Sequence, residues 1–485
     1  MVQGTTSWAG KSLLATALCR ALSRRGLTVA PFKAQNMSNN ARVVDGGEIG
    51  CAQYFQALAA RCTPHVDHNP ILLKPEADTR SQVVVLGSVD RELTEAPWRG
   101  RSSRLWPIVT AAYGRVAATA DVVVIEGAGS PAETNLAADD IVNMAMADHA
   151  DARVLLVTDI DRGGAFAHLY GTWALLPPNQ RGRIDGFVLN KFRGDPGLLA
   201  PAPADLEALT GVPTIGVLPM VHHDLPDEDG AAWDLRPSGA DGAVRVRIVR
   251  GPAASNLDEF WLLRQVADVR WATTAAELDD AELIVLPGSK LTSTDVAWMR
   301  SRGLDDAVRA GARRGARVVG VCGGAQMMGL AVDDPHGLEA ACTGLGLLPL
   351  RTELAPIKTV RRTTAAFSDL PAQWSTLHGM TVSGYEIHHG ITRFASEVSE
   401  ASEAGAHRVT TAVLPSGLGW AAGSLLAMYL HGCFEDPEFV ERLVGRRPVD
   451  QLEPTFEALA DLVDEHLDLT TVLSRAGVVD ATGET

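Results

Sequence analysis

Short, continuous apolar runs recur along the first part of the chain. They are 122–125 (VVVI), 154–157 (VLLV) and 187–189 (FVL). Runs without polar alternation are typical of parallel strands that are buried on both faces. Between residues 11 and 25, apolar side chains recur at positions 13, 14, 17, 18, 21 and 22, which predicts a helix ended by Gly26. This alternation predicts an open, parallel α/β sheet with right-handed crossovers.

A polar break divides the chain near residue 240. The segments 224–230 and 236–242 are rich in Asp, Pro and Gly and have no apolar period. A second series of apolar runs then starts at residue 244 and includes 283–286 and 318–322. We therefore expect three parts: an N-terminal α/β domain over 1–235, a second α/β domain over 244–440, and a C-terminal helical extension over 441–485.

Composition narrows the possible partners and the compartment. The 485 residues carry a formal net charge of −16, which argues against nucleic acid or anionic membranes as partners. No apolar stretch approaches the roughly 18 residues of a membrane span, and no signal peptide is visible. The six cysteines show no CxxC or Cys/His metal spacing, which argues against a disulfide framework or a zinc site and favours the reducing cytoplasm.

A glycine-rich segment, 4–12 (GTTSWAGKS), directly precedes the first predicted helix. Backbone N–H groups at such a turn converge on one point and bind phosphate, with help from the helix dipole. The segment departs from the usual P-loop because five residues, instead of four, separate its two glycines. The residues expected to bind ATP are Gly4, Thr5, Thr6, Gly10, Lys11 and Ser12, with Asn190 as a candidate reader of the adenine edge.

A phosphate loop needs an acidic residue at the end of a nearby strand to help hold Mg²⁺. Glu126 follows the run 122–125 and fits that position, and Asp45 is a second candidate. We therefore expect Ser12, Glu126 and Asp45 to be the metal ligands. Lys33, Lys74 and Arg80 are candidate cations for phosphate or for substrate carboxylates.

The second series of runs contains a candidate nucleophile. Cys322 follows an apolar run and has glycines as both second neighbours, Gly320 and Gly324, which permits a tight strand-to-helix turn. A cysteine at a helix N-terminus has a lowered pKa and is nucleophilic near neutral pH. The N–H groups of Gly323 and of the turn around Gly288 are the expected oxyanion donors. His431, 109 residues downstream, is the candidate base.

Together these motifs resemble the cobyric acid synthase family, the glutamine-dependent amidotransferases of cobalamin biosynthesis, over nearly the whole chain. The matching segments are 4–12, 32–38 (FKAQNMS), 126–133 (EGAGSPAE), 159–164, 286–290, 320–326, 384–390 and 429–432. The segment 32–38 is the most specific, because generic P-loop proteins have no reason to carry it.

The resemblance implies an ATPase domain like that of dethiobiotin synthetase, followed by a class I glutamine amidotransferase domain. It implies that Cys322 forms a thioester with glutamine, with Gln326 in the glutamine pocket and His431 acting as base and then acid. It further implies that ATP and Mg²⁺ activate four carboxylates (b, d, e and g) of adenosylcobyrinic acid a,c-diamide, which ammonia converts to amides. We expect Lys33, Asn36 and Ser38 to line the corrinoid site.

Two positions depart from the family pattern. The family usually has Asp where this chain has Trp8 in the phosphate loop. Other class I amidotransferases place Glu two residues after the catalytic histidine, where this chain has Cys433, and Glu435 is not an obvious substitute. No carboxylate partner for His431 is therefore expected.

Two other functions compete with this interpretation. A cobyrinic acid a,c-diamide synthase would share both domain types but amidate two other carboxylates, and the segments 32–38 and 126–133 argue against it. A regulatory P-loop ATPase without amidation would leave Cys322 and His431 unexplained. The sequence does not determine the oligomeric state.

Overall fold

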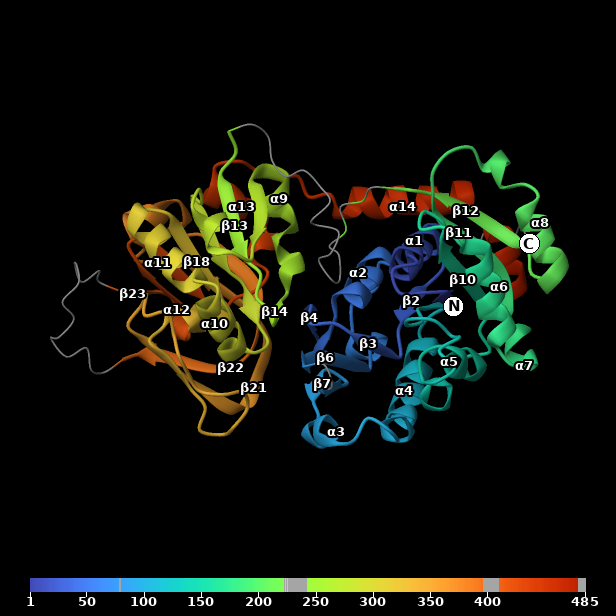
Figure 1. Cartoon of the computed structure of the whole chain (residues 1–485), viewed down its shortest axis with the longest axis horizontal. Coiled ribbons are helices and arrows are strands. Elements are labelled where there is room, and N and C mark those ends of the chain that lie inside the picture. The colour runs from blue at the N-terminus through green and yellow to red at the C-terminus, as the bar shows by residue number, and fades with distance from the viewer. Residues whose placement is uncertain (78–79, 222, 224, 226–241, 396–409, 479–485) are drawn as a thin grey trace.

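Two α/β halves lie side by side, as Figure 1 shows. The computed structural model describes residues 1–77, 80–221, 223, 225, 242–395 and 410–478. The first half comprises 1–221 and the second half 242–445, within these limits. The predicted boundary near residue 240 falls outside the described residues. None of the helices in the described part is long and apolar enough to cross a membrane.

The first half is built on parallel strands, in the order β1-β10-β11-β12, with the parallel pair β2-β9 beside β1. These strands are β1 (Val2–Gly4), β2 (Val29–Phe32), β9 (Val122–Ile125), β10 (Val154–Asp159), β11 (Ile184–Phe192) and β12 (Thr214–Pro219). The three apolar runs predicted as strands are confirmed as β9, β10 and β11. The α-helices are α1 (Lys11–Arg24), α3 (Arg91–Glu95), α4 (Arg101–Ala117), α5 (Met144–His149), α6 (Ala165–Leu175), α7 (Pro178–Arg181) and α8 (Ala202–Thr210).

Between β2 and β9 the chain forms additional elements that face the second half. A small sheet has the order β3-β6-β7-β8, and the hairpin β4-β5 leads directly into α2. Their bounds are β3 (Gln35–Met37), β4 (Ala41–Val44), β5 (Gly47–Gly50), α2 (Cys51–Ala59), β6 (Ile71–Ala77), β7 (Arg80–Val85) and β8 (Ser88–Val89). Its β4-β5 hairpin contacts β21 and β22 of the second half.

The second half has a seven-stranded sheet, β15-β13-β16-β18-β25-β24-β23, in which the first five strands are parallel. A long antiparallel hairpin, β21-β22, extends from it. The strands are β13 (Arg245–Val249), β14 (Ala254–Ser255), β15 (Asp268–Ala272), β16 (Leu283–Leu286), β17 (Gly288–Ser289), β18 (Arg317–Val321), β19 (Ala331–Asp333), β20 (Cys342–Thr343), β21 (Leu350–Ala366), β22 (Thr381–Phe394), β23 (Thr411–Leu414), β24 (Gly419–Ala422) and β25 (Leu425–Met428). The α-helices are α9 (Trp261–Val266), α10 (Thr292–Ser301), α11 (Leu304–Arg314), α12 (Gly323–Met328) and α13 (Pro437–Val444).

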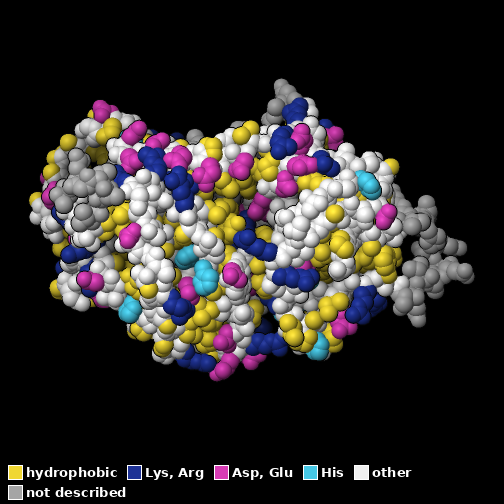
Figure 2. All heavy atoms as spheres, turned by 180° about the vertical axis from the view of Figure 1, so that it is seen from behind, with side chains coloured by type: hydrophobic (Ala, Val, Ile, Leu, Met, Phe, Trp, Pro, Cys, Tyr) yellow, Lys and Arg dark blue, Asp and Glu magenta, His cyan; other side chains and the backbone are white. Residues whose placement is uncertain are grey.

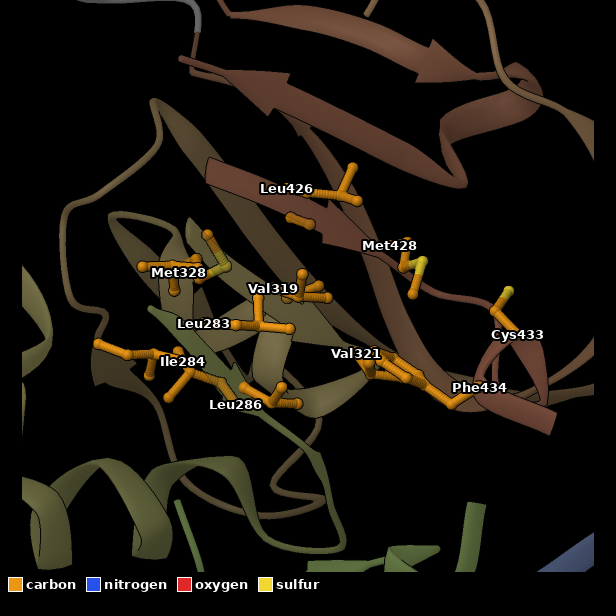
Figure 3. Close-up of a cluster of buried hydrophobic side chains, with 14 of the residues drawn as sticks. Leu283, Ile284, Leu286, Val319, Val321, Met328, Leu426, Met428, Cys433 and Phe434 are labelled. Carbon is orange, nitrogen blue, oxygen red and sulfur yellow. The ribbon is translucent and has the colours of Figure 1, made fainter. Parts of the chain in front are cut away.

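The core of the second half lies on the three central strands β16, β18 and β25. Figure 3 shows their side chains, among them Leu286, Val321 and Met428, packed against Met328 of α12 and Phe434. All five side chains are buried. Continuous apolar strands of this kind need cover on both faces, which is why the parallel sheet lies inside the half. Its carboxyl edge is consequently held rigidly.

The C-terminal helices, α14 (Leu452–His466) and α15 (Leu469–Ala476), return to the first half (Figure 1). The apolar side of α14 joins the core around α1, and Phe456 is buried there under the guanidinium of Arg20. Arg20 also pairs with Glu453 at 2.9 Å. The helical period expected in this part of the chain is therefore present, and α14 covers the outer face of α1.

Candidate active site

The segment 4–12 forms a turn between β1 and α1. Gly10 has φ = 101°, and a Cβ there would lie 1.9 Å from Nδ2 of Asn190, so only glycine fits. Asn190 Nδ2 donates to a loop carbonyl at 2.9 Å. The Lys11 ammonium donates to the carbonyls of Thr6 and Gly129, at 3.0 and 3.1 Å. The lysine thus lies across the mouth of the loop, in the position expected for a phosphate-binding group.

Other loop residues hold the backbone in place. Thr5 donates its hydroxyl to the Thr158 hydroxyl at 2.9 Å and its N–H to Val157 of β10 at 2.9 Å. Its side chain therefore fixes the loop to the sheet. Gly4 packs against Thr6 so closely that a Cβ would lie 2.9 Å from the Thr6 carbonyl oxygen. These contacts preorganise the backbone donors of the loop.

Two of the three predicted metal ligands are brought together. Ser12 donates its hydroxyl to Oε1 of Glu126 at 2.8 Å, and the Lys33 ammonium approaches the same oxygen at 2.8 Å. Burial raises the pKa of Glu126, but the charge and hydrogen bond of Lys33, together with hydrogen bonds from Gln56 and Ser12, keep that pKa below its ordinary value. A hydroxyl beside an ionised carboxylate suits Mg²⁺, which is usually held by one or two protein oxygens plus phosphate.

Two of the predicted charged residues lie elsewhere. Asp45 is exposed at the β4-β5 turn and is not among the residues that line the cavity at the phosphate loop, so its assignment as a metal ligand is wrong. Lys74 is buried against Glu48 at 2.5 Å, and burial lowers its pKa to about 7. Lys358 of β21 approaches the same carboxylate at 2.5 Å. Lys74 therefore contributes to the contact between the halves.

A cavity of about 1830 Å³ opens beside the phosphate loop. Lys33, Asn36 and Ser38 line it, together with Glu126 and Asn190. Its basic lining residues come from both halves and are Lys11, Lys33, Arg101, Arg162, Lys191, Arg193 and Arg250. Its exposed apolar side chains are Trp8, Met37, Trp98, Leu136 and Leu175. Four of these cations, Lys33, Arg162, Lys191 and Arg193, pair with carboxylates that line the same cavity. On the face of the molecule in Figure 2, Lys and Arg are likewise interspersed with Asp and Glu, so any attraction for an anionic ligand is local and does not come from a broad positive field.

Cys322 lies on a sharp turn between β18 and α12. Its φ of 49° and ψ of −107° are unusual for a residue with a side chain and indicate a strained backbone. The two flanking glycines leave no room for a side chain. A Cβ on Gly324 would lie 1.9 Å from the Leu286 carbonyl oxygen, and a Cβ on Gly320 would lie 2.6 Å from the Met328 sulfur. The thiol donates to the Ile387 carbonyl at 3.6 Å, and it lies close enough to His431 to help raise the pKa of that ring. This is the geometry of a nucleophile elbow.

His431 has a carboxylate partner, Glu259, which the sequence analysis did not find. Nδ1 of His431 lies 2.9 Å from Oε1 of Glu259, and Oε2 accepts the N–H of Gly432 at 2.9 Å. Burial lowers the pKa of His431, but Glu259 and then Cys322 reverse this and raise it to about 10. The expectation that no carboxylate contacts His431 is therefore wrong.

Glu259 could have been suspected from its neighbours. It follows Asp258 in an otherwise apolar stretch, 257–263 (LDEFWLL), and both carboxylates are fully buried. Buried carboxylates are rare unless they are paired. Its partner, however, lies 172 residues further along the chain, so the local spacing around His431 gave no indication of it.

The predicted glutamine-pocket residues surround the elbow. Gly288 packs against the His431 ring, since a Cβ on it would lie 2.7 Å from Cε1, and Gly323 packs equally closely on Ser289. Gln326 is buried one turn after the nucleophile, where it accepts from Thr292 at 3.0 Å. Its amide nitrogen donates to a tyrosine hydroxyl, that of Tyr429, at 3.3 Å. Gln326 therefore supports the wall of the site with both ends of its amide.

Comparisons with known proteins cover both sites. The chain matches the family model of the CobQ/CobB/MinD/ParA nucleotide binding domain over residues 1–228 and that of the CobB/CobQ-like glutamine amidotransferase domain over 245–439. The cobyric acid synthase of Variovorax paradoxus (strain S110) is 58% identical over 96% of this chain and 97% of its own length. Those of Paracidovorax citrulli (strain AAC00-1) and Albidiferax ferrireducens (strain ATCC BAA-621 / DSM 15236 / T118) are 58% and 56% identical, each over 96% of this chain and over 96% and 97% of their own lengths.

Proposed function

The chain belongs to the cobyric acid synthase family of glutamine-hydrolysing ligases, and we propose that it amidates carboxylates b, d, e and g of adenosylcobyrinic acid a,c-diamide. The observation that carries the proposal is the presence in one chain of a Cys322–His431–Glu259 group and a phosphate loop whose Ser12 contacts Glu126. The first group releases ammonia from glutamine, and the second activates the acceptor. A regulatory ATPase would have no use for the first.

In the glutaminase reaction, the Cys322 sulfur attacks the side-chain amide carbon of glutamine. His431 carries the proton that the leaving ammonia needs, and a carboxylate at Nδ1 fixes the ring and stabilises its charged form. The resulting thioester is hydrolysed when His431 takes a proton from water. The N–H groups at Gly288 and Gly323 would stabilise the oxyanion in both steps.

In the ligase reaction, an oxygen of the corrinoid carboxylate attacks the γ-phosphorus of ATP, and ADP leaves. Ammonia then attacks the acyl phosphate carbon and displaces phosphate, so that a poor electrophile is amidated through a good leaving group. Lys11 would stabilise the phosphate charge during transfer. Ser12 and Glu126 would hold Mg²⁺, which would neutralise the phosphate oxygens.

The cavity beside the phosphate loop suits a large, anionic ring system. Trp8, Met37 and Trp98 offer apolar surface for the faces of a macrocycle, and basic residues from both halves can contact its carboxylates. We place Lys33, Asn36 and Ser38 at this site. Because Lys33 also pairs with Glu126, it would contact the carboxylate beside the transferred phosphate.

The thiol form of all six cysteines supports a cytoplasmic location.

The test is mass spectrometry of the corrinoid after incubation with ATP, Mg²⁺ and glutamine. Four successive carboxylate-to-amide mass shifts are expected from the a,c-diamide, and none from fully amidated product. Conversion of cobyrinic acid at carboxylates a and c instead would contradict the substrate assignment. An increase in the KM for corrinoid, with the KM for glutamine unchanged, in Asn36→Ala would support the placement of the corrinoid site.

A further inference from the structure

Arg42, on β4 of the first half, extends into the second half beside the glutaminase site. Its side chain is buried, and Nη2 contacts both Asp258 and Glu435. Its guanidinium lies 5.6 Å from the ring centre of Tyr385 and 5.6 Å from that of Phe55. A buried arginine with two carboxylates from the other half is costly to place unless all three charges are paired.

Each contact of Arg42 in the second half is a neighbour of the glutaminase group. Asp258 directly precedes Glu259 in the chain. Tyr385 stacks on the His431 ring, with centroids 5.4 Å apart and planes 17° apart, and the two residues exchange backbone hydrogen bonds of 3.0 and 2.9 Å. The guanidinium thus contacts Tyr385, which stacks on the His431 ring, and Asp258, which precedes the carboxylate partner of that ring.

The other side of Arg42 leads to the phosphate loop. Phe55, which lies under the guanidinium, belongs to α2, the helix that directly follows the β4-β5 hairpin. The next residue, Gln56, donates to Oε2 of Glu126 at 2.5 Å, and Gln53 approaches the same oxygen at 3.5 Å. One helix therefore contacts both Arg42 and the carboxylate assigned to Mg²⁺.

The network also contains buried polar atoms that have no hydrogen-bond partner. They are Arg42 Nε, Asp258 Oδ1 and the Tyr385 hydroxyl. Buried polar groups are nearly always satisfied, and those that are not call for an explanation. All three atoms lie at the contact between the two halves, beside the glutaminase group.

We propose that Arg42 is a positioning residue, supplied by the first half, that aligns His431 and Glu259 for glutamine hydrolysis and links them through α2 to the phosphate loop. The proposal rests on the glutaminase role given to Cys322 and His431. It explains why a side chain from the nucleotide-binding half is buried beside the glutaminase group. Ammonia is then produced efficiently only while the two halves are docked.

The experiment compares Arg42→Gln, Arg42→Lys and Lys358→Gln in the full chain. Lys358→Gln is the matched control, because it removes another ion pair between the same two halves, that of Lys358 with Glu48, which also pairs with Lys74. Three rates are measured for each variant: glutamate formation, amidation driven by free ammonia, and alkylation of Cys322 by iodoacetamide, followed by peptide mass spectrometry. Glutamate formation is measured with and without Mg²⁺ and ATP.

In Arg42→Gln, we expect the kcat for glutamate formation to fall about 10- to 100-fold, in the range known for small misplacements of reacting groups, with the KM for glutamine nearly unchanged. Cys322 alkylation should slow, any stimulation by Mg²⁺ and ATP should shrink, and ammonia-driven amidation should persist. Arg42→Lys should restore part of the rate, because it keeps the charge. Lys358→Gln should behave like the wild type.

Equal loss of the glutamine- and ammonia-driven reactions, or the same loss in Lys358→Gln, would show that Arg42 only docks the halves. Unchanged kcat and alkylation in Arg42→Gln would overturn the inference directly. If Arg42→Gln does not fold, the Arg42→Lys variant provides the test by itself, because full glutaminase activity in that variant would exclude a role for the guanidinium geometry. The alkylation rate does not depend on the acceptor, so failure of corrinoid amidation contradicts the proposed function and leaves this test intact.

Discussion

The His431–Glu259 pair makes a quantitative prediction about charge. The pKa of His431 is about 10 against an ordinary 6.5, although burial alone would lower it, and Glu259 is the largest contributor to the rise. Since a tenfold change in an equilibrium constant corresponds to about 1.4 kcal/mol, the site favours the imidazolium by roughly 5 kcal/mol. Replacing Glu259 with Gln removes the charge while keeping a side chain of nearly the same shape.

The raised pKa of His431 determines whether the free energy of unfolding rises or falls with pH. A raised pKa in the folded state means that the folded protein binds the proton more tightly, so this stabilisation is complete below pH 6.5 and is lost as the pH rises through about 10. The wild-type free energy of unfolding should therefore fall across this interval relative to that of Glu259→Gln. Urea unfolding at a series of pH values measures the difference between the two slopes, in which the contributions of groups remote from Glu259 and His431 cancel.

The same variant should lose glutaminase activity. A neutral amide next to His431 no longer stabilises the imidazolium, and the expected loss in kcat is about 10²- to 10⁴-fold, by analogy with other acid-histidine-nucleophile groups. Ammonia-driven amidation should remain at the wild-type rate and serves as the internal control. Wild-type glutaminase kcat together with an unchanged pH slope would refute the assignment of Glu259 as the partner that charges His431.

Three further predictions concern the two sites and the fold. Cys322→Ser should abolish amidation with glutamine and retain it with free ammonia, whereas Lys11→Ala should lose both reactions, because phosphoryl transfer precedes ammonia attack. The ADP released per corrinoid distinguishes the two variants, and turnover of Lys11→Ala near the wild-type rate would contradict the phosphate-loop assignment. Gly324→Ala should destabilise the protein by about 1–3 kcal/mol and slow alkylation of the nucleophile, because the new methyl group would collide with the Leu286 carbonyl; a wild-type melting curve would argue against a tight elbow. Phe456→Ala should cost about 3–5 kcal/mol in urea unfolding by opening the core between α14 and α1, and a loss below 1 kcal/mol would indicate that α14 is not docked there.

Helices and strands that are determined by the local pattern of apolar side chains could be predicted well. The strands at 122–125, 154–157 and 187–189 and the helix that begins at Lys11 follow from side-chain periodicity, and the structure confirms them. The insertion between β2 and β9 was not anticipated. Its strands pair with one another and mix polar with apolar residues, and their apolar side chains, among them Ile71, Leu73 and Val83, are buried in the core of the first half, so no local pattern predicts the sheet.

The sequence alone determined the two reactive turns. Their glycine spacing can be recognised along the chain, and Gly10 has a positive φ of 101°, but the contacts that exclude a side chain are partly tertiary, since a Cβ would meet Asn190 at Gly10 and the Leu286 carbonyl at Gly324. The tertiary structure alone decided which charges meet: Glu259 pairs with a histidine 172 residues away, Arg42 reaches Asp258 across 216 residues, and Lys74 is buried in an ion pair instead of at the substrate site. A turn is fixed by local sterics, whereas a buried ion pair depends on how the separate sheets dock, and no local pattern in the sequence encodes that distance.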